Sequence, residues 1–259
     1  MSVSVRPPVA ALLVELGARL AASGDAQVGD AFTDDPAADA LIKSSPNAFL
    51  LGVLFTQGIP AERAWAGPSL LAQRLGHLDL RRLAAEPDAV EGAFAGPPCL
   101  HRFKHTLPRW VSAAAGKLLA EYGGDASRIW AKGSRVTEVT ERLSAFPGIG
   151  RKKAAMAVEI LTRHFGVELE GRECGSVAYD VHVRRVFLRT GLAEVDTPEA
   201  IERAAAEACA EAPGTLDLPA WLVGREWCRP SRPDCDACPL GEECARRVWL
   251  QVEGVGARR

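Results

Sequence analysis

The stretch Leu143-Ser144-Ala145-Phe146-Pro147-Gly148-Ile149-Gly150-Arg151-Lys152-Lys153-Ala154 decides the fold that we predict for this chain. An apolar helical pattern runs into it, is broken by Pro147, Gly148 and Gly150, and resumes over residues 151–164. The pattern predicts a helix, a tight hairpin and a second helix. Glycine tolerates positive φ and close backbone approach, and the second helix begins with unpaired N–H groups.

Two interpretations of the hairpin are open on this stretch alone. The glycines and the positive end of the second helix dipole can form a corner that binds phosphate. A glycine-rich turn between two core helices accounts for the same residues, and without further motifs it is the favoured interpretation. Two stretches downstream change the balance.

The composition is that of a globular protein with a sizeable core. The chain has 259 residues, 47% hydrophobic and 25% charged, enough for one large domain or two lobes. No apolar run reaches the length of a transmembrane helix. The apolar part of the first 20 residues is short and interrupted by Glu15, which argues against a signal peptide. We therefore expect a cytoplasmic protein, without a membrane partner, that acts as a monomer.

The formal net charge of −2 argues against a general nucleic-acid binder but leaves room for a local basic face. Basic residues gather in four groups, and we expect several of them to share one surface. The groups are Arg102, Lys104, His105 and Arg109; residues 151–153; Arg184, Arg185 and Arg189; and Arg246 with Arg247.

Helical periodicity covers most of the chain, and strand alternation is nearly absent, so the predicted class is all-α. Helices are predicted over residues 8–22, 46–55, 61–65, 70–83, 88–94, 101–122, 136–145, 151–164, 183–189, 198–212 and 218–227. Pro108 is expected either to kink its helix or to mark a later start. Loops are predicted at residues 24–39, 96–98 and 166–175, where glycine, proline and polar residues concentrate.

Four cysteines near the C-terminus form a C-x6-C-x2-C-x5-C pattern: Cys228, Cys235, Cys238 and Cys244. Four thiolates this close in sequence can ligate one soft metal centre, and the prolines between them suit a loop wrapped around it. Zinc and a [4Fe–4S] cluster both accept four thiolates, so the spacing alone leaves the two open. Cys99, Cys174 and Cys209 stand apart and are expected to be ordinary thiols.

The third motif is Tyr179-Asp180-Val181-His182-Val183-Arg184-Arg185-Val186. Asp180 precedes an apolar-periodic helix, which is a good N-cap position. Considered alone, Asp180 is expected to cap the helix, and His182 to be a packed histidine.

Together, the Phe-Pro-Gly-Ile-Gly-Arg-Lys-Lys-Ala hairpin, Tyr-Asp-Val-His-Val-x-Arg-Val and the cysteine pattern resemble the endonuclease III branch of the helix–hairpin–helix DNA glycosylase superfamily. They occur in the family's order, and the resemblance covers about residues 47–244. It implies two helical lobes, a helical-barrel lobe with the hairpin and an iron–sulfur cluster lobe, with a DNA-binding cleft between them. The predicted domains are residues 47–175 for the barrel lobe, and residues 1–46 with 176–259 for the cluster lobe.

The resemblance also implies roles for single residues. Lys152 matches the family's Schiff-base lysine and Asp180 its essential aspartate. Cys228, Cys235, Cys238 and Cys244 match the ligands of its [4Fe–4S] cluster. The implied DNA contacts are Gly148 and Gly150 on the phosphate backbone, Gln57 and Leu100 as side chains inserted into the duplex, and His182.

The implied activity is base excision repair of duplex DNA that carries damaged bases or abasic sites. A damaged base has to be flipped out of the stack before an enzyme can reach it. A neutral lysine amine then attacks the sugar C1′ and forms an imine, which permits β-elimination at the abasic site. A carboxylate can stabilise cationic sugar character and assist proton transfer. We expect Lys153, one position further along, to be a solvated lysine or to contact phosphate.

The chain departs from the family pattern in three places. Residues 166–176 hold extra residues between the hairpin helix and Asp180. Phe55-Thr56-Gln57-Gly58-Ile59-Pro60 replaces the family's Ser-Ala-Gln-Ala-Thr-Asp, and the segment before Asn47 has no clear match. The expected function is a bifunctional glycosylase and abasic-site lyase for oxidised pyrimidines. The alternatives are a monofunctional glycosylase, for example for adenine opposite oxidised guanine, and a catalytically weak or silent cluster-bearing DNA-binding protein.

Overall fold

The computed structural model describes residues 8–22 and 31–250, and these residues form helices joined by turns and loops. Extended pairing in these ranges is limited to an isolated parallel bridge between Arg135 and Glu170. The predicted all-α class is confirmed. In the same residues, no helix is long and apolar enough to cross a membrane.

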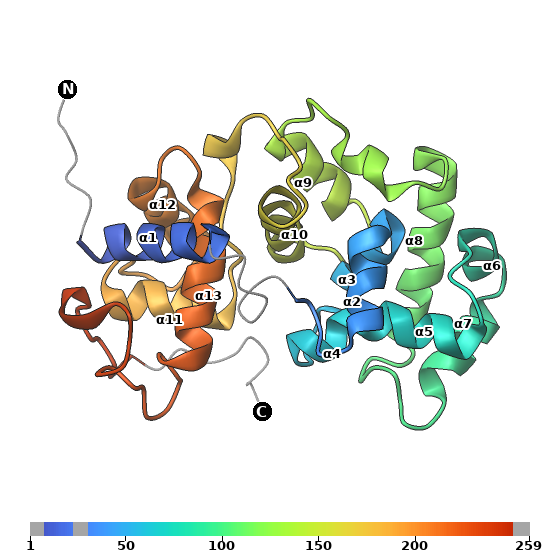
Figure 1. Cartoon of the computed structure of the whole chain (residues 1–259), viewed down its shortest axis with the longest axis horizontal. Coiled ribbons are helices and arrows are strands. Elements are labelled where there is room, and N and C mark those ends of the chain that lie inside the picture. The colour runs from blue at the N-terminus through green and yellow to red at the C-terminus, as the bar shows by residue number, and fades with distance from the viewer. Residues whose placement is uncertain (1–7, 23–30, 251–259) are drawn as a thin grey trace.

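The helices lie in space as two groups, with α10 between them (Figure 1). The second group combines α1 with the helices that follow α10 in the chain. The first group is α2 (Pro36–Ser44), α3 (Pro46–Phe55), α4 (Ala61–Trp65), α5 (Gly67–Leu75), α6 (Leu80–Ala85), α7 (Pro87–Ala95), α8 (Thr106–Tyr122), η1 (Ala126–Trp130) and α9 (Val136–Ser144). Then come α10 (Arg151–Arg163) and η2 (Arg172–Cys174). The second group is α1 (Pro8–Ala22), α11 (Val181–Thr190), α12 (Pro198–Ala208), η3 (Pro213–Leu216), α13 (Asp217–Glu226) and η4 (Gly241–Glu243).

Two regions differ from the predicted elements because local capping outweighs periodicity. The helix predicted over residues 70–83 is two helices: α5 ends at Gly76, which has φ +76°, and Asp79 caps α6 by accepting the Arg82 N–H. The loop predicted over residues 24–39 contains the start of α2, where Asp35 accepts the Ala37 N–H. Residues 24–30 of that predicted loop lie outside the described residues.

Each group of helices encloses its own hydrophobic core. The larger core runs from Ile42 to Leu169 and includes the aromatic rings of Phe49, Phe55 and Phe94. The smaller core joins residues of α1 to residues of α11, α12 and α13, including Leu13, Phe187 and Val223. The large lobe and the small lobe are named here by these two cores.

The predicted domain boundary at Asn47 separates α2 from helices that α2 packs against. Ile42 of α2 lies in the larger core, with Phe32 and Leu41 packed against that core, and α2 contacts α3, α4 and α5. Residues 31–46 therefore pack with the large lobe, and α1 packs with the small one. Residues 1–7, 23–30 and 251–259 of the predicted domains are not described, and the division into domains stays a prediction.

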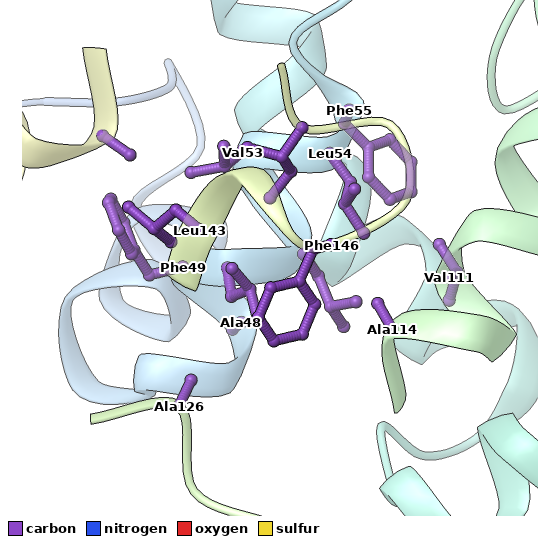
Figure 2. Close-up of a cluster of buried hydrophobic side chains, with 14 of the residues drawn as sticks. Ala48, Phe49, Val53, Leu54, Phe55, Val111, Ala114, Ala126, Leu143 and Phe146 are labelled. Carbon is purple, nitrogen blue, oxygen red and sulfur yellow. The ribbon is translucent and has the colours of Figure 1, made fainter. Parts of the chain in front are cut away.

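The hairpin between α9 and α10 is anchored in the larger core. Phe146 is fully buried, and Figure 2 shows its ring among side chains of α3, α8 and α9. Ile149 is also buried and donates its N–H to the Phe146 carbonyl. These two apolar anchors explain why α10 begins at a defined place beside the small lobe.

Ion pairs cross from one lobe to the other. Arg151 at the start of α10 bonds Glu202 of α12, with 2.9 Å between NH2 and Oε2. Arg225 of α13 bonds Glu62 of α4, with 2.7 Å between NH1 and Oε1. Exposed pairs such as these contribute about 0–1 kcal/mol each. These ion pairs therefore contribute little to the stability of the interface, and their main effect is on the relative orientation of the two lobes.

Candidate functional site

Gly148 and Gly150 have different structural jobs in the hairpin. Gly148 has φ +80°, and a Cβ placed there would overlap the Trp110 ring. Gly150 is the N-cap of α10 with extended backbone, φ −93° and ψ 178°, and a Cβ on it would meet open space. Gly148 is thus required for close packing on α8. Gly150 instead leaves the start of α10 uncovered.

We expect Gly148→Ala to destabilise the protein by about 2–5 kcal/mol. Left-handed backbone costs a non-glycine residue about 1–2 kcal/mol, and overpacking against Trp110 adds about 1–3 kcal/mol. Gly150→Ala is the matched control, with an expected change within about 1 kcal/mol, because only N-cap preference changes. Urea unfolding of the two variants measures both values. Equal losses at the two positions would contradict this account of the hairpin.

Lys152 and Asp180 form an ion pair between the lobes, with 2.6 Å between Nζ and Oδ2. Lys152 lies in the first turn of α10, and 51% of its side chain is exposed, whereas the Asp180 side chain is 16% exposed. Asp180 caps α11 as predicted, because its Oδ1 accepts the His182 N–H at 2.8 Å. One carboxylate therefore holds both a helix start and a reachable amine.

Two opposing effects set the pKa of Asp180. Burial alone would raise it, but the charge and hydrogen bond of Lys152, together with the His182 N–H, bring the pKa below its ordinary value. Asp180 is consequently ionised at neutral pH. An ionised carboxylate in this place can stabilise a nearby cation and accept a proton from the lysine.

Lys153 is neither solvated nor at a phosphate-binding surface, which corrects the prediction for this residue. It is only 8% exposed, and its Nζ donates to the Leu54 carbonyl at 2.8 Å. The Nζ also lies 5.8 Å from the centre of the Trp110 ring. Burial, and secondarily the charge of Lys152, lowers the pKa of Lys153 to about 8. Lys153 therefore ties the start of α10 to the end of α3.

The predicted duplex-entering residues Gln57 and Leu100 lie in very different surroundings. Gln57 is partly buried in the loop after α3. Leu100 is 4% exposed and packs in the larger core, so it is not presented to a ligand, and this corrects its placement. The side chains beside the Gln57 loop are Arg102, which donates to the Gly58 carbonyl at 3.2 Å, and Phe103. The signal for them was the basic and aromatic run at residues 101–105.

His182, the second residue of α11, packs against α13, as expected for a histidine considered alone. Its ring is 6.1 Å from the Trp221 ring, centre to centre, and its Nδ1 lies 3.1 Å from an Arg185 nitrogen. Its backbone leaves no room for a Cβ on Gly224. The residue is partly exposed, so its predicted DNA contact stays a prediction.

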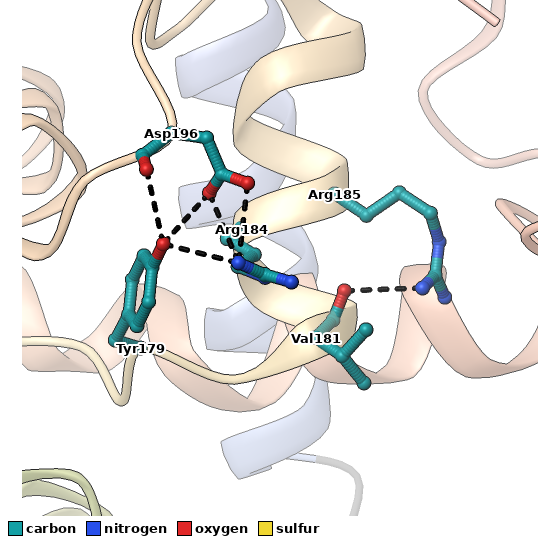
Figure 3. Close-up of polar contacts among 5 residues, drawn as sticks. All are labelled: Tyr179, Val181, Arg184, Arg185 and Asp196. Carbon is teal, nitrogen blue, oxygen red and sulfur yellow. Dashed lines mark hydrogen bonds and ion pairs between the residues drawn. The ribbon is translucent and has the colours of Figure 1, made fainter. Parts of the chain in front are cut away.

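The arginines of α11 are internal, which corrects their assignment to a basic surface. Arg184 bonds Asp196 and the Tyr179 hydroxyl, and Figure 3 shows this network beside α11. Arg185 donates to the Val181, Gly224 and Cys228 carbonyls. The spacing along α11 was the available signal, since Arg185 and Arg189 lie four residues apart and therefore on one face of the helix.

Of the four predicted basic groups, the ones around the loop before α8 and at the start of α10 are largely exposed, and Arg246 of the C-terminal group is exposed as well. Arg102, Lys104, His105, Arg109 and Arg151 are exposed. Carboxylates engage some of them: His105 bonds Glu91, and Arg151 bonds Glu202. The local basic face is therefore smaller than the sequence predicts.

The four patterned cysteines line one small cavity of about 20 Å³, open in part to solvent. Arg189 reaches the same loop, donating to the Arg229 and Pro230 carbonyls and lying 3.8 Å from the Cys228 sulfur. None of the seven cysteines, all in described residues, forms a disulfide.

The donor set fits a four-thiolate centre, but its geometry is not that of a finished ligand shell. Across the described ranges, no group of three or more His, Cys, Asp or Glu side chains is gathered closely enough to hold a metal ion. Burial raises the pKa of Cys238 and that of Cys244, so these two stay thiols at neutral pH until a metal displaces their protons. The predicted [4Fe–4S] cluster therefore stays a prediction.

Two partly buried acidic side chains beside the ion pair were not predicted from the sequence. Asp217 begins α13 and accepts the Ala178 N–H, and Glu159 lies on α10 against Gly214. Neither belongs to a motif. Their only sequence signal is an acidic residue within an apolar helical pattern.

The chain is similar in sequence to endonuclease III proteins over part of its length. It is 36% identical over 104 residues to endonuclease III of Rickettsia conorii, covering 39% of this chain and 44% of that protein. It is 31% identical over 113 residues to endonuclease III of Thermotoga maritima, covering 43% and 48%. The chain thus matches slightly less than half the length of these curated relatives. A scan against known protein-family profiles finds no match.

Solved structures match over nearly the whole chain. A trapped endonuclease III–DNA covalent intermediate has a TM-score of 0.63 at 18% identity, covering 92% of this chain and 96% of the other. A thermostable thymine-DNA glycosylase also has a TM-score of 0.63, at 13% identity, covering 93% and 98%. These likenesses establish the arrangement of helices.

Proposed function

We propose that this chain is a DNA glycosylase of base excision repair. The proposal is supported by its sequence similarity to endonuclease III proteins and by its all-α helix–hairpin–helix glycosylase fold. The observation that carries the proposal is the contact between Lys152 and Asp180. An accessible amine and an ionised carboxylate from different lobes meet at the start of α10, next to the hairpin. A lysine–carboxylate pair is the chemistry that covalent catalysis at a sugar C1′ needs.

The finer proposal is a bifunctional enzyme that acts on oxidised pyrimidines. Lys152 gives up a proton, and its Nζ attacks C1′ while the C1′–N bond to the base breaks. The base leaves with the bonding electrons and takes up a proton. Nζ then loses a further proton, the C1′–O4′ bond breaks and O4′ takes up a proton, so that the sugar ring opens and an imine forms at C1′. The imine acidifies C2′; loss of a C2′ proton then expels the 3′ phosphate and cuts the strand. Asp180 holds the Lys152 ammonium before the reaction, accepts its proton and stabilises cationic character at C1′.

Access to the base requires flipping, with protein side chains filling the vacated space. We propose Gln57 for this role, supported by its place on a loop at the end of α3. Arg102 and Phe103 lie against that loop at Gly58, and Arg102 stacks 5.2 Å from the centre of the Phe103 ring. The departure of residues 55–60 from the family pattern falls on this same loop, so we expect the range of lesions to be set here.

The hairpin is proposed to hold the phosphate backbone through the uncovered start of α10. Gly150→Leu should weaken binding to all duplexes by a similar factor, because phosphate contacts carry no sequence or lesion information. Fluorescence anisotropy with undamaged, abasic and oxidised duplexes measures the factor. A loss confined to one lesion would place Gly150 in the base pocket instead.

Cys228, Cys235, Cys238 and Cys244 are proposed to hold a [4Fe–4S] cluster in the loop that follows α13. Their resemblance to the family's ligand set supports this choice over zinc. A bound cluster would supply four metal–thiolate bonds that close the loop. Arg185 and Arg189 would join the closed loop to α11, which Asp180 caps.

The test is an assay of base release and strand cleavage on a panel of duplexes. The panel contains an oxidised pyrimidine, adenine opposite oxidised guanine, a preformed abasic site and undamaged DNA. Cleavage with borohydride trapping on the oxidised pyrimidine is expected. Base release without cleavage would indicate a monofunctional glycosylase. Binding without either reaction on any duplex would contradict the enzyme proposal and favour a silent DNA-binding protein.

A further inference from the structure

Asp217 lies at the seam between the lobes, three contacts away from the Lys152 amine, through Ala178 and Asp180. Its Oδ1 accepts the Ala178 N–H at 2.6 Å. The carbonyl of the same residue, Ala178, accepts the Asp180 N–H at 2.6 Å. The backbone of Ala178 is therefore fixed on both sides, by Asp217 on one and by Asp180 on the other.

Glu159 places a second carboxyl at the same seam. It follows Lys152 by seven residues on α10, which is nearly two full turns, so the two side chains share one face of the helix. That face meets the small lobe twice. Lys152 bonds Asp180, and Glu159 lies so close to Gly214 that a Cβ there would overlap Oε1. Gly214 belongs to η3, directly before Asp217.

The electrostatics of the two carboxyls agree with this geometry. Burial, with the charges of Glu159 and Asp180, raises the pKa of Asp217 to about 7 against the opposing Ala178 bond and Lys152 charge. Burial likewise raises the pKa of Glu159 to about 7, opposed by Arg172 and Arg163. A buried carboxyl is costly where an apolar residue would pack, and such groups cluster at functional sites.

We propose that Asp217 is a positioning residue: its carboxyl fixes the turn at residues 178–180 and thereby holds Asp180 against Lys152. The proposal rests on the proposed function, in which this pair performs the covalent step. Asp217 does not touch the amine itself. It acts through the backbone of Ala178, and what it requires is an acceptor oxygen, not a charge.

The distinction between acceptor and charge defines the variants. Asp217→Asn keeps an oxygen that accepts the Ala178 N–H, whereas Asp217→Leu keeps the approximate volume and removes the acceptor. Single-turnover borohydride trapping on an abasic duplex should stay within about threefold of wild type in the asparagine variant. It should fall by about tenfold or more in the leucine variant, because small misplacements of reacting groups cost this much. The duplex dissociation constant should change by less than about threefold in both, because Asp217 is not placed at a DNA contact.

A second readout does not depend on enzyme activity. Reductive methylation of Lys152 with formaldehyde and cyanoborohydride, quantified by peptide mass spectrometry, reports how firmly Asp180 holds the ammonium. Lys132, which is exposed and remote in sequence, serves as the internal reference. Methylation of Lys152 should rise severalfold in Asp217→Leu and stay at the wild-type level in Asp217→Asn, because only the former releases Asp180.

The outcomes separate the proposal from the function on which it rests. Wild-type trapping in a folded Asp217→Leu, or equal losses in the asparagine and leucine variants, overturns the positioning role. If the leucine variant fails to fold, Asp217→Ala replaces it, and unfolding of both overturns the role in favour of a purely structural one. If the wild type traps on no duplex, the proposed function fails. The methylation of Lys152 in the variants then still decides whether Asp217 positions Asp180.

Discussion

Lys152→Ala is expected to abolish borohydride trapping and strand cleavage while duplex binding survives. The alanine has no nucleophile to form the imine, and the hairpin that we propose for phosphate binding is unchanged. Trapping yield and the dissociation constant for an abasic duplex measure the two effects separately. Loss of binding in parallel with trapping would show that Lys152 acts as a phosphate contact and not as the nucleophile.

The matched control is Lys153→Met, one position along the helix. The methionine keeps the apolar stem beside Trp110 and loses the bond to the Leu54 carbonyl. We expect trapping to persist, because one helical step turns a side chain by about 100° and the Lys153 amine is enclosed by protein. Trapping that is lost in Lys153→Met but kept in Lys152→Ala would shift the catalytic role to the buried amine.

Cys238→Ala is expected to remove the cluster and to lower the melting temperature by roughly 10 °C. Metal–thiolate binding contributes directly to folding free energy, and a loss of about 3 kcal/mol or more gives a shift of this size in a chain of this length. Iron content, visible absorbance and thermal melting of anaerobically purified protein give the measurement. Cys174→Ala, at an exposed cysteine outside the cavity, should leave all three unchanged.

Two results would contradict the account of the cysteine loop. A colourless wild-type protein with one zinc ion per chain would show that the four cysteines form a zinc site and not a cluster site. An unchanged melting temperature in a cluster-free Cys238→Ala would show that the loop does not depend on ligation. In that case the bonds of Arg185 and Arg189 to the loop carbonyls would be its main support.

The elements that were predicted correctly depend on local chemistry. Proline and glycine break the pattern at residues 147–150, and the observed ends of α9 and α10 lie within one residue of the predicted ends. Asp180 was placed at a helix start by its position before an apolar-periodic run, and it caps α11. Periodicity and capping act within a few residues, so a single sequence contains both.

The features that were missed depend on contacts between distant parts of the chain. Lys153 is buried because its amine finds the Leu54 carbonyl 99 positions away. Asp217 is partly buried, and its carboxyl meets the Ala178 N–H from another element. Arg185 and Arg189 of α11 bond carbonyls of the cysteine loop about 40 positions on. Charged residues are usually exposed, so they were expected at the surface. Only a hydrogen-bonding partner from a distant part of the chain offsets the free-energy cost of burying them.

The meeting of Lys152 with Asp180 is an intermediate case. Neither periodicity nor spacing relates two residues on different lobes, so the pairing was expected only through the family resemblance. The structure places the two side chains in contact. It also shows that Leu100, which the same resemblance predicts to insert into the duplex, is a core residue. The two motif residues are in contact, whereas Leu100, from the weakly matching middle of the chain, is buried; the catalytic roles of Lys152 and Asp180 stay proposals.

The most direct test of the central claim is to locate the covalent adduct. Wild-type protein is incubated with an abasic duplex and borohydride and then digested with a protease. The protease is chosen so that an adduct on each lysine within residues 151–163 can be assigned when the peptides are sequenced by mass spectrometry. The account predicts a single reduced adduct on the Nζ of Lys152. An adduct on any other amine, or no adduct under conditions where the duplex is bound, would contradict it.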